Sequence, residues 1–119
     1  MLEERPCRFQ TLKKSEAFAR VLRQGQWIRG TWFHLYYLPE PADGIYAGFA
    51  ASRKLYTRVR KNRAKRRLRE VFRRYCGWLP PGSFVLMGTE KTLQAPFPAL
   101  VQEFHRLRQK LPHGVSSSA

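Results

Sequence analysis

The sequence predicts a single small domain of the α+β class. Its elements follow the order α-β-β-α-β-α, with room for a third strand before the long central helix. A chain of 119 residues can bury one modest core, and a hydrophobic content of 43% is typical of a folded protein. Segments with apolar residues at helical spacing alternate with strand-like runs of branched and aromatic residues. We expect an irregular segment over 1–13, the folded domain over 14–111 and a disordered tail over 112–119.

The first helix is expected over 15–23, where Ser15 can act as the N-cap and Gly25 ends the helix. The aromatic stretch 26–38 then predicts a strand. Alternation along a strand places side chains on two faces. One face would carry Trp32, His34, Tyr36 and Leu38, and the other Phe33, Leu35 and Tyr37.

After a turn rich in proline and glycine, a second strand is expected from Ile45 to about Leu55. A helix over 57–75 and a buried strand over 83–89 follow, which suggests a parallel strand–helix–strand unit. Residues 90–97 are expected to be a connection. Pro98 suits the first turn of a last helix, whose apolar positions are Phe97, Leu100, Val101, Phe104, Leu107 and Leu111.

The segment 53–74 is the most basic part of the chain. Twelve of its 22 residues are Lys or Arg, and Glu70 is its only acid. Apolar residues nevertheless recur there at helical spacing, at Ala64, Leu68, Val71, Phe72 and Tyr75. At 100° per residue, the opposite side of that helix carries Asn62, Arg66, Arg69 and Arg73, flanked by Arg58, Arg63 and Lys65. The pattern predicts a helix with one buried side and one cationic side.

Like charges on one helical face repel each other, and Arg66, Arg69 and Arg73 follow at spacings of three and four. A polyanion would relieve this repulsion. Arginine outnumbers lysine nine to three in the segment, and its planar fork suits phosphates and base edges. The simpler alternative is a basic, solvated face without a specific partner. The chain's pI of about 10.9 points to nucleic acid or an anionic membrane surface as the partner.

We find no catalytic or metal-binding pattern in the sequence. His34, His105 and His113 lack the spacing of metal ligands, and there is no glycine-rich phosphate loop. No apolar run approaches 18 residues, so we expect no membrane span. The N-terminal residues lack the apolar core of a signal peptide. We therefore interpret Cys7 and Cys76 as reduced thiols of a cytoplasmic protein.

The stretch S-R-K-L-Y-T-R-V-R-K-N-R-A-K-R-R-L-R-E-V-F-R at 52–73 resembles the signature of the bacterial ribonuclease P protein subunit. The resemblance extends to L-K-K-S-E-A-F-A-R-V-L-R-Q-G at 12–25 and to F-H-L-Y at 33–36, and covers roughly residues 9–110. Lys61 stands for the first arginine of the family's Arg-Asn-Arg core. Tyr56 stands where many members have a small residue.

The resemblance implies the order α-β-β-β-α-β-α, with a left-handed crossover through the basic helix. It implies a protein that assists removal of the 5′ leader from precursor tRNA, while a large RNA with Mg²⁺ carries out the hydrolysis and the protein itself holds no cofactor. The residues expected to face the catalytic RNA are Arg58, Lys61, Asn62, Arg63, Lys65, Arg66, Arg69 and Arg73. Those expected in a leader-binding cleft are Phe18, Trp32, Tyr36, Arg53 and Lys54.

Other readings fit the residues as well. The first is a ribosomal or structural RNA-binding protein without an associated activity. The second is a helix-based DNA-binding protein, which is weakened because no second short helix precedes the basic one. Phe18 and Trp32 could equally be core residues, since aromatic stripes usually pack inside, whereas the hydroxyl of Tyr36 favours a wet edge.

Overall fold

The computed structural model describes residues 3–111, which form one α+β domain around a mixed five-stranded sheet. The strands are β1 (Phe9–Thr11), β2 (Gln26–Ile28), β3 (Phe33–Leu38), β4 (Ile45–Ala51) and β5 (Gly82–Gly88). Their order across the sheet is β1-β4-β5-β3-β2. β4 runs parallel to both β1 and β5, whereas β3 runs antiparallel to both β5 and β2.

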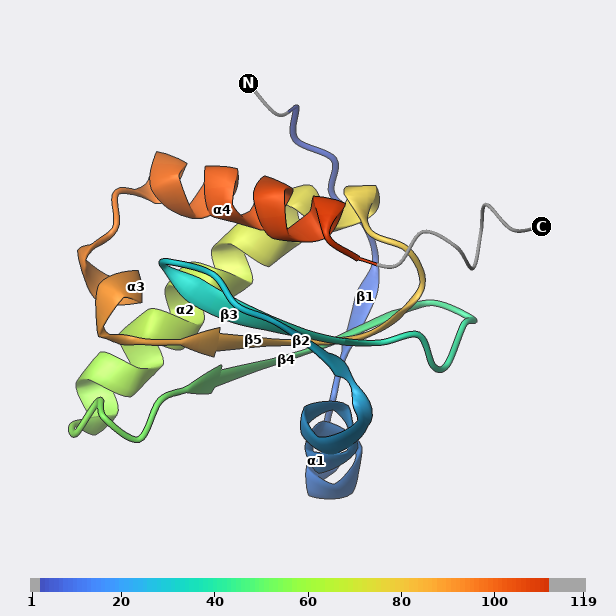
Figure 1. Ribbon diagram of the computed structural model, residues 1–119, viewed down its shortest axis with the longest axis horizontal. Helices are drawn as coiled ribbons and strands as arrows, with labels where there is room; N and C mark the ends of the chain where they lie inside the picture. Colours follow the sequence, from blue (N-terminus) through green and yellow to red (C-terminus); the bar gives the residue numbers. More distant parts are fainter. Residues whose placement is uncertain (1–2, 112–119) are drawn as a thin grey trace.

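Helices cover the two faces of the sheet unequally (Figure 1). They are α1 (Ser15–Gln24), α2 (Arg58–Tyr75), the 3₁₀ turn η1 (Cys76–Trp78), α3 (Glu90–Gln94) and α4 (Phe97–Gln109). α1 lies alone on one face, and α2 and α4 cover the other. The adjacent parallel strands β4 and β5, joined through α2, confirm the predicted strand–helix–strand unit.

The main core lies between the sheet and the helices α2 and α4. Phe72 of α2 is fully buried, and its ring contacts four others at centroid distances from 4.8 to 6.1 Å, namely those of Phe9, Phe49, Phe84 and Phe104. Burial of a phenylalanine side chain stabilises a fold by about 1.5–3 kcal/mol. The apolar stripe predicted for the basic helix is therefore its core-facing side.

A second, smaller core lies under α1. Val21, Leu38 and Val85 are buried there, with Phe18 and Tyr36 partly covered beside them. A Cβ atom at Gly48 of β4 would lie 2.5 Å from the ring of Phe18. Only a glycine at this position lets the ring rest directly on the sheet.

Strand β3 has the predicted alternation, but the aromatic stretch before it turns back on itself. β2 pairs antiparallel with β3, and Trp27 lies opposite Tyr36. Trp32 falls in the loop between the two strands and packs against the main core, where its carbonyl accepts a hydrogen bond from the buried Thr92 hydroxyl at 2.5 Å. The expectation that Trp32 shares a face with His34 and Tyr36 is wrong, because alternation holds only within a continuous strand.

Other boundaries differ from the sequence prediction. Residues 9–11 are not irregular but form β1, which pairs with β4 from Phe9 opposite Ile45. β4 ends at Ala51 instead of continuing to Leu55, and the expected connection contains the short helix α3. The predicted tail 112–119 lies outside the described residues.

Cys7 and Cys76 form a disulfide, which corrects the expectation of two free thiols. They are 69 residues apart in sequence, but their Cα atoms lie 5.6 Å apart, a separation usual for disulfides. The fold creates this proximity by passing residues 3–8, which we call the N-terminal strap, along the C-terminal end of α2.

Backbone hydrogen bonds also hold the N-terminal strap. The amide of Arg5 donates to the carbonyl of Arg74 at 2.8 Å, and the amide of Gly77 donates to the carbonyl of Arg5 at 2.6 Å. The Arg5 guanidinium lies 3.7 Å from the ring centre of Trp78, whose indole N–H donates to the carbonyl of Glu3 at 2.8 Å. A Cβ at Gly77 would lie 2.6 Å from the Arg5 carbonyl oxygen, so the strap needs glycine there.

Candidate nucleic-acid interface

The basic segment folds as predicted, into a helix with one buried and one cationic side. Thr57 is the N-cap of α2, and its hydroxyl accepts a hydrogen bond from the amide of Arg60 at 3.1 Å. The buried positions of α2 are the five of the predicted apolar stripe. The exposed positions are Arg58, Val59, Arg60, Asn62, Arg63, Arg66, Arg69 and Arg73. Lys61 and Lys65 are half-buried.

Several of these cations have no carboxylate partner among the described residues. Within residues 3–111, no carboxylate forms an ion pair with Arg58, Arg63, Arg66 or Arg69. The guanidinium of Arg69 lies over the ring of Phe49, 5.2 Å from its centre. We call Arg58, Arg63, Arg66 and Arg69 the cationic row. These side chains are exposed and are therefore available to an external polyanion.

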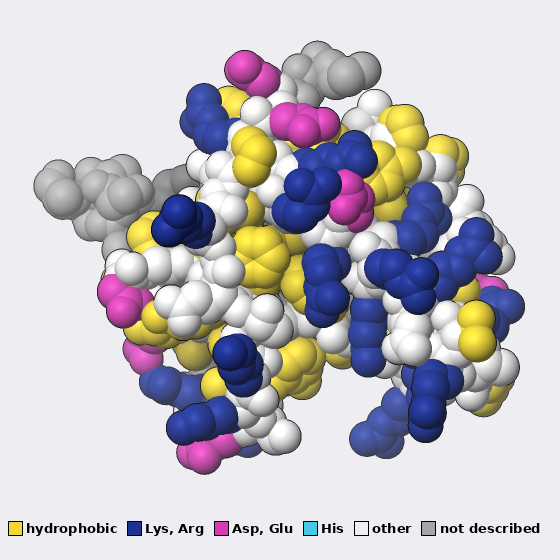
Figure 2. Space-filling model, turned by 180° about the vertical axis from the view of Figure 1, so that it is seen from behind, with side chains coloured by type: hydrophobic (Ala, Val, Ile, Leu, Met, Phe, Trp, Pro, Cys, Tyr) yellow, Lys and Arg dark blue, Asp and Glu magenta, His cyan; other side chains and the backbone are white. Residues whose placement is uncertain are grey.

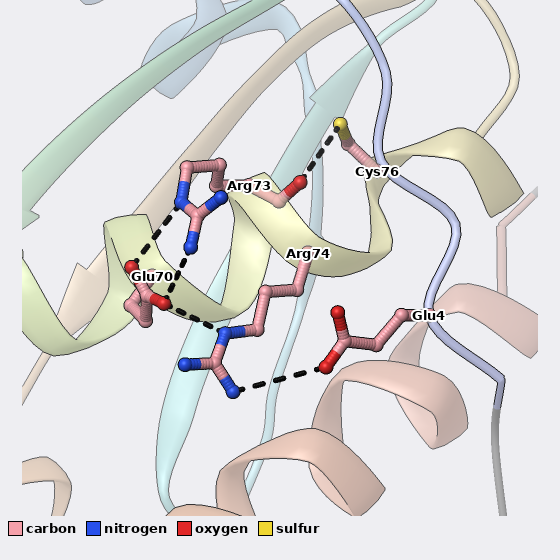
Figure 3. Close-up of polar contacts among 5 residues, drawn as sticks. All are labelled: Glu4, Glu70, Arg73, Arg74 and Cys76. Carbon is pink, nitrogen blue, oxygen red and sulfur yellow. Dashed lines mark hydrogen bonds and ion pairs between the residues drawn. The ribbon is translucent and has the colours of Figure 1, made fainter.

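The cationic side of α2 is partly neutralised at its C-terminal end, which sets Arg73 apart from the other predicted contacts. Glu70 accepts hydrogen bonds from Arg73 at 2.7 Å and from Arg74 at 2.6 Å, and Arg74 also lies 3.9 Å from Glu4 (Figure 3). Hydrogen bonds from Arg73 and then Arg74 lower the pKa of Glu70 below its ordinary value. Glu70 is therefore ionised at neutral pH, and Arg73 offers less unpaired charge than Arg66.

Two further arginines of α2 are used inside the protein. Arg60 pairs with Glu90 of α3, and Arg67 donates to the carbonyls of Thr92 and Leu93 at 2.8 and 3.2 Å. These contacts fix α3 beside α2. Figure 2, in which α2 faces the viewer, shows Lys and Arg side chains following the helix across the surface.

The sheet face beside α1 carries the second set of predicted residues. Tyr36 and Phe18 are both half-exposed there, beside the small core. Since opposite residues of paired strands share a face, the pairing with Tyr36 places Trp27 on this face too. Trp27 is 53% exposed, and its ring meets the imidazole of His34 edge-on at 5.7 Å.

Trp27 thus occupies the place that the sequence prediction gave to Trp32. A signal for this was available, because Gly30 lies between two aromatic runs and a glycine there favours a hairpin. The prediction of one continuous strand over 26–38 missed this hairpin. The structure brings Phe18 and Tyr36 together, adds Trp27 and leaves Trp32 on the other side of the sheet.

The same face continues into a cationic cavity at the end of the sheet. The cavity has a volume of about 1100 Å³ and includes the predicted residues Arg53 and Lys54. His34 and Met87, which are opposite each other on β3 and β5, connect it to the aromatic face. The other cations that line it are Arg29, Lys91, Arg106 and Lys110. An extended anionic strand could lie on the aromatic rings and continue into this cavity.

Glu103 of α4 holds the loop between β2 and β3, which lies at the mouth of the cavity. Its buried carboxylate accepts a hydrogen bond from the amide of Thr31 at 2.8 Å and pairs with Arg106. Burial and the charge of Arg29 lower the pKa of His34, against a smaller opposing effect of Glu103. His34 is therefore neutral at pH 7 and adds an aromatic surface instead of a charge.

The described residues hold no group of three or more His, Cys, Asp or Glu side chains that could bind a metal ion. None of their helices is long and apolar enough to cross a membrane. The cationic row of α2 and the aromatic face that leads into the cavity are the candidate surfaces for a partner.

Comparison with known proteins points to one family. The family model described as Ribonuclease P matches residues 7–112. The ribonuclease P protein component of Nitratiruptor sp. is 35% identical over 102 residues, which are 86% of this chain and 92% of that protein. The corresponding protein of Thermus oshimai is 38% identical over 84% of this chain and 63% of its own length.

Solved structures share the fold. The RNase P protein from Thermotoga maritima superimposes with a TM-score of 0.74 at 22% identity, covering 87% of this chain and 98% of its own. The Staphylococcus aureus RNase P protein gives a TM-score of 0.69 at 19% identity, with coverages of 82% and 90%. On the sequence match over residues 7–112, this chain belongs to the ribonuclease P protein family and is a subunit of the ribonucleoprotein that processes tRNA.

Proposed function

We propose that α2 binds the catalytic RNA of ribonuclease P and that the aromatic face beside α1 binds the 5′ leader of precursor tRNA. The RNA, with Mg²⁺, carries out the phosphodiester hydrolysis, and the side chains of this chain position the two RNAs. We expect such a subunit to act in the cytoplasm, without a membrane partner.

The row Arg58, Arg63, Arg66 and Arg69 carries this proposal. It is exposed, and within residues 3–111 it lacks carboxylate partners. Arginines bind phosphates with charge-assisted hydrogen bonds in a fixed fork. Asn62, exposed on the same side of α2, can donate or accept hydrogen bonds with a base edge or donate to a phosphate.

The leader assignment rests on the second surface. Single-stranded nucleic acid is bound by aromatic side chains that stack on bases and by cations that follow the backbone. Trp27 and Tyr36 provide exposed ring surface, and Arg53 and Lys54 line the cavity beyond them. A leader of several unpaired nucleotides fits this combination.

The proposal is tested by reconstitution. The purified protein alone should not cleave precursor tRNA, but added to the catalytic RNA it should permit cleavage at low Mg²⁺ and raise the affinity for the leader. A protein that changes neither the cleavage rate nor leader affinity would fit a structural RNA-binding protein instead.

The two aromatic residues give a sharper test of leader binding. Trp27→Ala or Tyr36→Ala should each weaken binding of precursor tRNA to the holoenzyme by about fivefold or more, since a stacked base contributes about 1–3 kcal/mol. Binding of mature tRNA, which lacks the leader, should be unchanged. The measurement is a titration of both tRNAs against holoenzyme assembled with saturating protein.

The matched control is Trp32→Ala, which removes the same kind of side chain from the other side of the sheet. It should lower the melting temperature without separating precursor from mature tRNA. Equal losses for both tRNAs in Trp27→Ala would mean a defect of folding or assembly and would contradict the leader assignment.

A further inference from the structure

Two exposed apolar side chains stand at the start of α2, within the most basic part of the surface. Tyr56 is 88% exposed and Val59 is 76% exposed. Within residues 3–111, the other large hydrophobic residue with comparable exposure is Trp27, on the aromatic face. Neither Tyr56 nor Val59 belongs to the cationic row or to the proposed leader surface.

The backbone fixes Tyr56 in its outward position. The preceding residue, Leu55, is fully buried, and its amide donates to the carbonyl of Ser52 at 3.0 Å. The following residue, Thr57, is the N-cap of α2 and holds the amide of Arg60. The ring therefore projects from a loop that is anchored on both sides, so little ordering is needed when a ligand binds.

Val59 connects this ring to the cationic row. It lies three, four and seven residues before Asn62, Arg63 and Arg66, and these spacings place all four residues on one helical face. Such a face normally carries polar residues only. An exposed valine in line with the arginines indicates a ligand that offers an apolar surface next to its charges.

An unpaired nucleobase matches this description. Its flat face is apolar, and its neighbouring phosphates are anionic, so aromatic rings set among cations are typical of single-stranded nucleic acid binding. Arg53, Lys54 and Arg58, all exposed, surround Tyr56 in sequence. Within the part of the chain that the structure describes, the Tyr56 ring makes no ring contact and no hydrogen bond.

We propose that Tyr56 and Val59 bind an unpaired base of the catalytic RNA, with the ring stacked on the base and the valine packed against its edge. The proposal rests on the proposed function, because Val59 shares its face with the arginines assigned to that RNA. It adds an apolar contact to an interface otherwise made of charges.

The salt dependence of the affinity distinguishes charge contacts from stacking contacts. The affinity of a charge contact falls with salt through counterion release, whereas a stacking contact contributes equally at all salt concentrations. Tyr56→Ala should therefore weaken binding to the catalytic RNA by about 5- to 150-fold, with an unchanged slope of log affinity against log salt. Tyr56→Phe keeps the ring and should bind within about twofold of the unchanged protein. Because Tyr56 is exposed, both variants should retain the melting temperature.

The outcomes distinguish the two proposals. If the unchanged protein does not bind the catalytic RNA, the proposed function fails. If it binds and Tyr56→Ala binds equally well, only the base site is overturned. A loss in Tyr56→Phe equal to that in Tyr56→Ala would also overturn stacking. A loss confined to precursor tRNA, with affinity for the catalytic RNA intact, would assign the ring to the leader and overturn the site as proposed.

Discussion

Replacing both Arg66 and Arg69 with alanine is expected to weaken binding to the catalytic RNA by on the order of a hundredfold at low salt. Each arginine can donate charge-assisted hydrogen bonds, which contribute about 1.5 kcal/mol or more apiece. Neither side chain has a carboxylate partner within residues 3–111, so no internal ion pair is lost with it. The effect should appear mainly at the interface, since the contact of Arg69 with the ring of Phe49 contributes only about 0.5–1 kcal/mol to stability.

The salt dependence identifies the contacts as phosphate contacts. Loss of two such contacts should reduce the slope of log affinity against log salt by about one to two units. The measurement is a binding titration at several salt concentrations. An unchanged slope would remove this part of α2 from the interface.

Two control variants separate position from net charge. Arg20→Ala with Arg23→Ala removes two exposed charges from α1 and should leave the affinity for the catalytic RNA nearly unchanged. Arg73→Ala removes a charge from the same helix that Glu70 already neutralises. It should cost less affinity than Arg66→Ala, and the reverse order would contradict the assigned role of Glu70.

Removal of the disulfide is expected to give the largest loss of stability. A bond between residues 69 apart closes a long loop, and the chain-entropy model assigns such a loop about 4 kcal/mol of the free energy of unfolding. For a domain of this size, the melting temperature should fall by on the order of 15 °C. The double variant Cys7→Ser with Cys76→Ser, measured by thermal unfolding, tests this directly.

A reductant gives the matched control. It should lower the melting temperature of the unchanged protein to that of the double variant, and should not alter the double variant itself. A melting temperature that is insensitive to reductant in the unchanged protein would contradict the bond between Cys7 and Cys76. The backbone hydrogen bonds of the N-terminal strap should keep part of its order after reduction.

Features that depend on neighbours in sequence were predictable. The buried stripe of α2 follows from helical periodicity, and the cationic row follows from the same periodicity applied to the arginines. The ion pairs of Glu70 with Arg73 and Arg74 were also readable, since spacings of three and four place these side chains together. The prediction for Arg73 overlooked this local signal.

Features that depend on distant segments were not predictable from local pattern. The choice of Trp27 over Trp32 for the aromatic face depends on the hairpin register between β2 and β3. Residues 9–11 are a strand only because the edge of β4 is available to pair with them. The disulfide exists because the N-terminal strap, which directly precedes this strand, passes the C-terminal end of α2.

The sequence by itself determined that this protein has a helix with a core-facing side and a cationic side, because helical periodicity and side-chain charge are local properties. The tertiary structure decided which aromatic rings share the face beside α1, which arginine pairs with Glu90 of α3, and which cysteines meet. These outcomes depend on strand register and on contacts between residues far apart in the chain, which local spacing does not specify.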